Sequence, residues 1–185
     1  NVIHESDIAV TVTDTTVSAS DLDTVEGLTT GLVTVNSTTL TGTRAEINAT
    51  LATATTEVTG LASINATVSD ASTVAQINVT SALTTGSVTA TVSDTDLTTL
   101  GGLNETGNAY TITITDTGSI DAATVNVLNG KTTGVIDLTT ATTVTGALSD
   151  IKALYDAPLT EVTGLGNEAV TVSDTTLTAT VLNTL

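Results

Sequence analysis

The sequence lacks cysteine, methionine, tryptophan and phenylalanine, and its 185 residues include one proline and two tyrosines. Without cysteine the chain can form neither disulfide bonds nor thiolate metal sites. The apolar residues are almost all Val, Leu, Ile and Ala, whereas a thick globular core is normally filled with larger side chains. Thr accounts for roughly a quarter of the chain, and its β-branching favours extended strands. The composition therefore predicts strands around a thin core.

Positive charge is also scarce, since Arg44, Lys131 and Lys152 are the basic residues against a net charge of −17. A nucleic-acid-binding protein needs a basic face to neutralise phosphates, and anionic membrane surfaces attract basic segments. No apolar run approaches the roughly 18 residues of a membrane-spanning helix. We therefore expect no nucleic-acid partner and no membrane span.

Groups suited to catalysis are few. A Ser-His-Asp arrangement would depend on the lone His4 near the start of the chain, and a single histidine without cysteine argues against zinc. Asp21 and Asp23 could form the carboxylate pair of a glycosidase. Sugar-cleaving sites usually add aromatic platforms, for which only Tyr110 and Tyr155 are available. The sequence predicts that the protein is not an enzyme and has no cofactor.

The chain opens at Asn1, with neither an initiator methionine nor a signal peptide. This start predicts a processed or excised part of a longer product. The acidic, lysine-poor and threonine-rich composition is typical of a secreted bacterial surface protein. We therefore expect an extracellular or cell-surface location.

Five segments share an alternating pattern that ends in aspartate. They read AVTVTD (9–14), NATVSD (65–70), TATVSD (89–94), TITITD (111–116) and AVTVSD (169–174). Apolar residues alternate with Thr or Ser in each segment, which is the period-2 pattern of a half-buried strand. The aspartates are Asp14, Asp70, Asp94, Asp116 and Asp174, and the central threonines are Thr11, Thr67, Thr91, Thr113 and Thr171.

Thr-Gly pairs divide the chain into units of similar length. Cutting there gives seven coils, 8–31, 32–60, 61–86, 87–108, 109–134, 135–164 and 165–185. Above this period, residues 8–61 realign on residues 110–165, and the sequence TEVTGL occurs at both 56–61 and 160–165. An internal duplication of this kind indicates a repeat architecture.

These patterns predict a parallel β-solenoid of about seven stacked coils, with short helices or helical turns along one side. In each coil the strand is followed by apolar residues at helical spacing, as in RAEINATLA (44–52) and LSDIKALYDA (148–157). The solenoid would span residues 8–185 as a single domain. The tail 1–7 would complete the last coil of a neighbouring molecule, because the final coil stops part-way round.

Two segments, AVTVSDTTLTATVLNTL (169–185) and VLNGKTTGVIDLTTATTVTG (127–146), resemble the Thr/Ala/Asp-rich repeats of giant surface proteins in cyanobacteria and other aquatic bacteria. The resemblance covers nearly the whole chain. It implies an extracellular location and a repetitive structural role, and it carries over no catalytic residues.

The repeated aspartates have two interpretations. They could bind calcium at the corners of the coils, because carboxylates and carbonyls bind this ion in some solenoids. They could instead accept hydrogen bonds from backbone N–H groups of adjacent turns. No GGxGxD or EF-hand pattern occurs, so calcium stays an alternative to a cofactor-free protein.

The five central threonines predict an outward Thr-x-Thr ladder, which resembles the regular face of ice-binding proteins. Thr also suits any exposed strand. Coils two and six interrupt the ladder, because they place Asn36 and Asp137 where the pattern would continue. Ice binding is therefore a second hypothesis.

N-glycosylation sequons begin at Asn36, Asn48, Asn65, Asn78 and Asn104, and about as many would arise by chance in so Thr-rich a chain. Glycans on Asn or Thr are thus chemically feasible without being indicated.

The function predicted from these features is structural. We expect a subunit or segment of an extracellular filament, assembled head to tail from copies of itself through the ends of the solenoid. The alternatives are the stalk of a calcium-assisted adhesin and an ice-binding solenoid.

Overall fold

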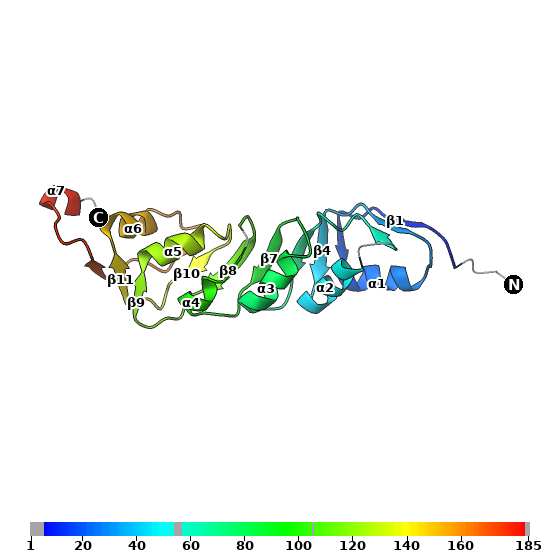
Figure 1. The fold of residues 1–185 in the computed structure, drawn as a ribbon, viewed down its shortest axis with the longest axis horizontal. Helices are drawn as coiled ribbons and strands as arrows, with labels where there is room; N and C mark the ends of the chain where they lie inside the picture. Colours follow the sequence, from blue (N-terminus) through cyan, green and yellow to red (C-terminus); the bar gives the residue numbers. More distant parts are fainter. Residues whose placement is uncertain (1–5, 54–56, 105, 184–185) are drawn as a thin grey trace. The chain divides into compact units, whose positions relative to one another are not determined.

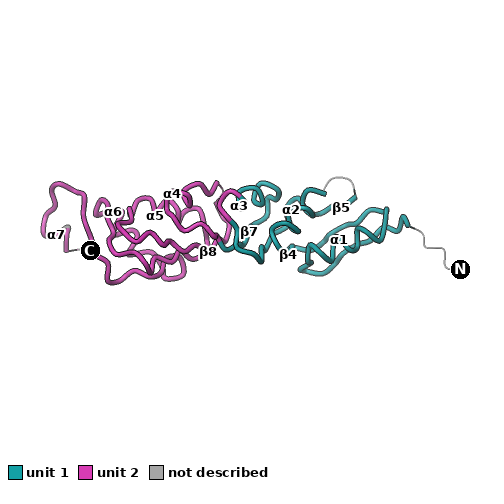
Figure 2. Tube along the Cα trace, turned by 90° about the horizontal axis from the view of Figure 1, so that it is seen from below, with its two compact units in different colours: residues 1–72, 76–91 teal, residues 73–75, 92–185 magenta. Residues whose placement is uncertain are grey.

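The computed structural model describes residues 6–53, 57–104 and 106–183. The chain divides into two compact units. Unit 1 comprises residues 1–72 and 76–91, and unit 2 comprises residues 73–75 and 92–185 (Figure 2).

Unit 1 alternates short parallel strands with helices (Figure 1). Its strands are β1 (Val10–Val12), β2 (Thr16–Ser18), β3 (Val33–Val35), β4 (Thr39–Gly42), β5 (Val58–Thr59), β6 (Asn65–Val68) and β7 (Val88–Thr91). Its helices are α1 (Ala19–Gly27), α2 (Arg44–Ala52) and most of α3 (Val74–Ser81). Hydrogen bonds join the strands in the orders β1-β3-β5 and β2-β4-β6-β7, and every pair is parallel.

Unit 2 is built in the same way. Its strands are β8 (Ala109–Thr113), β9 (Ser119–Asp121), β10 (Ile136–Asp137), β11 (Thr143–Gly146), β12 (Val162–Thr163) and β13 (Ala169–Val172). Its helices are α4 (Leu97–Leu100), α5 (Ala122–Asn129), α6 (Leu148–Tyr155) and α7 (Ala179–Leu182). The strand orders are β8-β10-β12 and β9-β11-β13, again parallel throughout.

The order of elements follows the internal duplication of the sequence. The N-terminal duplicate runs β1-β2-α1-β3-β4-α2-β5-β6, and the C-terminal duplicate runs β8-β9-α5-β10-β11-α6-β12-β13. In each duplicate the two longer helices pack against each other, α1 against α2 and α5 against α6. Segment 92–103, which contains α4, precedes the C-terminal duplicate in unit 2.

The helices form because local capping and apolar spacing agree. At the start of α2 the Thr43 hydroxyl accepts the Glu46 N–H at 3.4 Å, and the Glu46 carboxylate accepts the Thr43 N–H at 2.8 Å. This reciprocal pair is a capping box, which satisfies two backbone donors at the helix start. Ile47 and Leu51, four residues apart, are buried on one face of the helix. Local sequence thus supports a helix of nine residues.

The prediction of a parallel β-solenoid with short helices or helical turns along one side is wrong. The structure is α/β, with parallel sheets and with helices α1, α2, α3, α5 and α6 that are eight or nine residues long. The apolar residues spaced three or four apart bury a full helical face, which a single turn could not do. Description of the chain as a β-solenoid repeat fibre is corrected with it, because the residues gather into two compact α/β units.

The core of each unit is thin and aliphatic. Along β3 the burial alternates, with Val33 and Val35 buried and Thr34 half-buried between them. In unit 2 the large buried side chains are Ile112, Ile114, Ile120, Leu128 and Tyr110. Each fully buried aliphatic side chain contributes about 1.5–3 kcal/mol of transfer free energy. The expectation of a thin Val/Leu/Ile/Ala core agrees with these residues.

Candidate functional surface

Four of the five repeated aspartates hold the start of a helix in the preceding stretch of chain. The carboxylate accepts the N–H of the first helical residue at 2.6–2.9 Å in the pairs Asp70–Arg44, Asp94–Val74, Asp116–Leu97 and Asp174–Leu148. A carboxylate at this position satisfies a donor that has no partner within its own helix. These bonds tie each strand motif to the helix before it.

Asp14 is the fifth aspartate and differs from the others. Its side chain is exposed, and within residues 6–53, 57–104 and 106–183 no helix start donates to it. Among the same described residues, no group of three or more His, Cys, Asp or Glu side chains could hold a metal ion. A calcium site at any of these aspartates stays a prediction.

The five threonines of the expected ladder do not form one column. Thr11, Thr67 and Thr91 belong to unit 1, and Thr113 and Thr171 belong to unit 2. Thr67 pairs with Thr89, two residues before Thr91, because β6 and β7 align Ala66 with Val88. All five are exposed or half-buried.

Unit 1 instead holds two other hydroxyl columns, which its strand register creates. The first column is Thr11-Thr34-Thr59 on β1, β3 and β5. The second is Ser18-Thr41-Thr67-Thr89 on β2, β4, β6 and β7. In unit 2 the matching columns are Thr113-Asp137-Thr163 and Asp121-Thr145-Thr171, each of which contains one carboxylate. A continuous hydroxyl surface is thus a property of unit 1.

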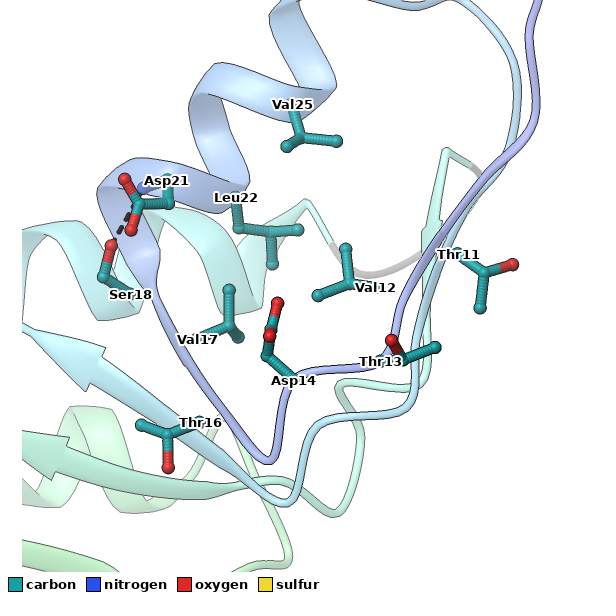
Figure 3. Close-up of a pocket in the computed structure, with 10 residues that line it drawn as sticks. All are labelled: Thr11, Val12, Thr13, Asp14, Thr16, Val17, Ser18, Asp21, Leu22 and Val25. Carbon is teal, nitrogen blue, oxygen red and sulfur yellow. Dashed lines mark hydrogen bonds between the residues drawn. The ribbon is translucent and has the colours of Figure 1, made fainter.

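A hollow lined by both apolar and polar side chains opens at β1, β2 and α1 in unit 1, with a volume of about 410 Å³. Val12, Val17, Leu22 and Val25 point toward one another across it, and Asp14 lies beside them (Figure 3). The side chains of Thr11, Thr13 and Thr16 point away (Figure 3). Sequence reasoning missed this hollow. The sequence did contain one sign of it, because Leu22 and Val25, in the first unit of the repeat, are spaced to lie on one face of a helix.

Unit 2 has a smaller hollow of about 230 Å³ beside a tyrosine–carboxylate pair. The Tyr155 hydroxyl donates to Glu168 at 3.0 Å, and the Gly166 N–H donates to the same carboxylate at 2.8 Å. Burial and the bond to Glu168 raise the pKa of Tyr155 to about 12. Burial alone would raise the pKa of Glu168, but the N–H bonds from Gly166 and its neighbours lower it overall. The pair fixes the loop before β13 and offers no acid or base poised near neutral pH.

The predicted glycosylation asparagines lie in different environments. Asn36 and Asn104 are exposed. The Asn48 side chain accepts the Thr80 hydroxyl, and the Asn65 side chain accepts the Ser87 N–H. Asn78 is half-buried on α3. His4 and residues 1–5 of the predicted tail lie outside the described residues.

Asp21 and Asp23 are both exposed on α1, and the Asp21 N–H binds the Ser18 hydroxyl that caps the helix. No described helix has the length and apolar character needed to cross a membrane. Comparison with family models, curated proteins and solved structures finds no match to this chain. Its own geometry therefore carries the functional argument.

Proposed function

We propose that the chain is a non-catalytic structural module of an extracellular or cell-surface protein, and that it assembles head to tail with copies of itself. The observation that carries the proposal is the outer edge of β13. Within the described residues β13 pairs with β11 on one side and with no strand on the other. An open strand edge presents unpaired N–H and C=O groups that pair readily with another chain.

The composition of β13 favours pairing with another strand, because it lacks the residues that usually block such pairing. Its sequence AVTV has no charge, no proline and no lysine, the usual features that block edge-to-edge pairing. Val170 is 37% exposed, whereas Ala66, its counterpart on β6, is 0% exposed. A second strand added there would bury Val170 as β7 helps to bury Ala66.

The net charge of −17 opposes association of two copies at long range. Salt screens exposed charges beyond about 10 Å at 0.1 M ionic strength, whereas apolar contacts and strand pairing persist. The proposal therefore predicts that assembly strengthens as salt is added. An extracellular location is supported by the acidic, threonine-rich composition and by its resemblance to bacterial surface repeats.

Sedimentation velocity over a wide range of concentration and salt tests the proposal. We expect the mean mass to rise with both, and a Val170→Lys variant to remain monomeric because it places a charge on the open edge. Val127 on α5 is 64% exposed, so Val127→Lys is the matched control and should assemble as the wild type does. A wild-type chain that stays monomeric under all conditions would refute the function.

Ice binding is a second candidate, favoured by the two hydroxyl columns of unit 1. Neighbouring parallel strands lie about 4.8 Å apart, so the hydroxyl groups within each column are regularly spaced. Thermal hysteresis of the purified chain tests this hypothesis. Thr34→Asp should abolish any activity, because it reproduces the carboxylate at the matching position of unit 2. Thr24→Asp on exposed α1 is the control, and equal effects of the two variants would exclude the columns.

A further inference from the structure

The hollow of the N-terminal duplicate has a filled counterpart in the C-terminal duplicate. There, segment 92–103 hydrogen-bonds to β8 and the residues after it, and α4 packs against α5. Val92, Leu97, Leu100 and Leu103 of this segment are all buried. The positions that match the hollow residues are buried as well, namely Ile114, Ile120, Val125 and Leu128.

Hydrogen bonds fix the covering segment in unit 2, and Lys131 donates to the Gly101 and Leu103 carbonyls near its end. The Val92 N–H donates to the Thr111 carbonyl at 2.9 Å, and the Thr115 N–H donates to the Thr95 carbonyl at 3.1 Å. The Leu97 N–H donates to the Asp116 carboxylate at 2.9 Å. The covering segment thus extends the strand pairing and satisfies the aspartate that follows β8.

In the N-terminal duplicate Val17 and Leu22 are buried as well, but Val12 and Val25 are only half-buried. Ile8, which matches Tyr110, is 54% exposed, whereas Tyr110 is 1% exposed. Leu28, at the end of α1, is a further exposed apolar side chain. Asp14, which matches Asp116, is the aspartate whose carboxylate receives no helix N–H among the described residues. We call this surface, formed by residues 8–28, the socket.

A sequence fitted to the socket occurs a second time in the chain. The covering segment begins VSDTDLT (92–98), and residues 172–178 read VSDTTLT, so that the two differ only in Asp96 against Thr176. This second segment is not packed into a core, since Leu177 is 37% and Leu182 is 49% exposed. Residues 175–183 carry no charge, so they add no negative charge to a hollow that already holds Asp14 and Asp21. We call residues 172–182 the plug.

We propose that the plug of one molecule occupies the socket of a second copy of the chain, in the arrangement that segment 92–103 adopts over the C-terminal duplicate. The inference rests on the proposed function and specifies its interface. Leu177 enters the hollow as Leu97 does in unit 2. The Leu177 N–H binds Asp14, the Val172 N–H binds the Ala9 carbonyl, and the Thr13 N–H binds the Thr175 carbonyl.

A complementation experiment tests this interface, because plug and socket are different surfaces. A charge in a buried apolar contact is costly, so Leu177→Asp should disable the plug and Ile8→Asp should disable the socket. Each side chain is partly exposed in the single chain, so that both variants should fold, which circular dichroism checks. Leu159→Asp, at another exposed leucine, adds the same charge as a control and should assemble normally.

In sedimentation velocity we expect each disabled variant alone to be monomeric. An equimolar mixture should form a dimer and stop there, because one intact plug and one intact socket remain. Assembly of either variant alone at wild-type strength, or a mixture that stays monomeric, would overturn the proposed interface. If the wild type assembles while the variants behave like Leu159→Asp, self-assembly stands and this interface is wrong. If the wild type never assembles, both proposals fail.

Discussion

The strands β1 and β8 occupy matching positions in the two duplicates, yet one is open and the other is enclosed. Segment 92–103 hydrogen-bonds to β8, whereas among the described residues β1 has β3 as its one strand neighbour. The apolar residues themselves are comparable, with Val10 and Val12 on β1, Ile112 on β8 and Ile114 just after it. Burial in this architecture is therefore set by the neighbouring segment rather than by the sequence of the strand.

The largest difference in stability is expected when the matching residues Tyr110, on β8, and Ile8, just before β1, are each replaced by alanine. Tyr110→Ala should cost about 3–5 kcal/mol, because it leaves a cavity in a closed core. Ile8→Ala should change stability by no more than about 0.5 kcal/mol, because its side chain is largely exposed. Urea unfolding followed by circular dichroism, at a concentration where the chain is monomeric, measures both. Similar losses would show that the socket is closed in the single molecule.

The two duplicates have the same sharp turn, which follows β5 in the first and β12 in the second. Gly60 and Gly164 have φ angles of +95° and +85°, and an added Cβ would lie 2.0 Å from the Val35 carbonyl oxygen and 2.3 Å from the Thr139 nitrogen. Gly60→Ala and Gly164→Ala should each cost about 2 kcal/mol or more, through the left-handed backbone and the clash.

Thermal unfolding compares these variants with Gly27→Ala, whose Cβ meets open space and which should be neutral or slightly stabilising. A loss at only one of the two positions would mean that the turns are not equivalent.

Much of this arrangement was accessible from the sequence. The five strand motifs lie on or beside β1, β6, β7, β8 and β13, and the duplication recurs as a repeated order of elements. The prediction failed for the way in which the strands and helices pack together. Apolar spacing in segment 44–52 indicated a short helix or helical turn on a solenoid, whereas capping at Thr43 and burial of Ile47 sustain a helix of nine residues within an α/β unit. Helices of this length are stabilised mainly by tertiary packing, which local sequence does not show.

The functional surface was less accessible still. Because Thr67 and Thr91 each lie three residues before an aspartate, the sequence suggests that they align. In the structure β6 and β7 pair Thr67 with Thr89 instead, a shift of two residues. Register depends on how the intervening helix and turn return the chain, which a motif alone does not specify. The hollow at Leu22 and Val25 also required three dimensions, because β1, β2 and α1 meet around it.

Helix capping gives a smaller difference between the duplicates. Thr43 caps α2 with its side chain, whereas Ala147, at the matching position before α6, makes no side-chain cap. Thr43→Ala should destabilise by about 1 kcal/mol, and Ala147→Thr should stabilise by a similar amount. Thermal unfolding of the two variants measures both the expected loss and the expected gain of stability. Thr43→Ser, which keeps the hydroxyl, is the control and should change little. If Ala147→Thr does not raise the stability, the backbone N–H groups at the start of α6 already have hydrogen-bond partners.

The smallest expected difference depends on pH and involves the pair Tyr155–Glu168. The matching residues of the N-terminal duplicate, Leu51 and Ile64, are buried and apolar. Because folding raises the pKa of Tyr155 from 10 to about 12, the protonated phenol favours the folded state. This contribution is complete below pH 10 and is lost as pH rises from 10 toward 12. The lowered pKa of Glu168 acts in the opposite range, since its contribution is present above pH 4.5 and is lost in acid.

The double variant Tyr155→Leu/Glu168→Ile copies the apolar pair of the N-terminal duplicate and removes both titrating groups. We expect it to lose less stability between pH 10 and pH 12 than the wild type does, as measured by urea unfolding at a series of pH values. Tyr155→Phe keeps the ring and deletes the hydroxyl, so it separates the hydrogen bond from the packing. Phenolate absorbance of the wild type minus that of Tyr155→Phe gives the ionisation of Tyr155 directly. A midpoint near 10 would mean that the hydroxyl is solvated, and the two duplicates would then respond alike to alkali at this position.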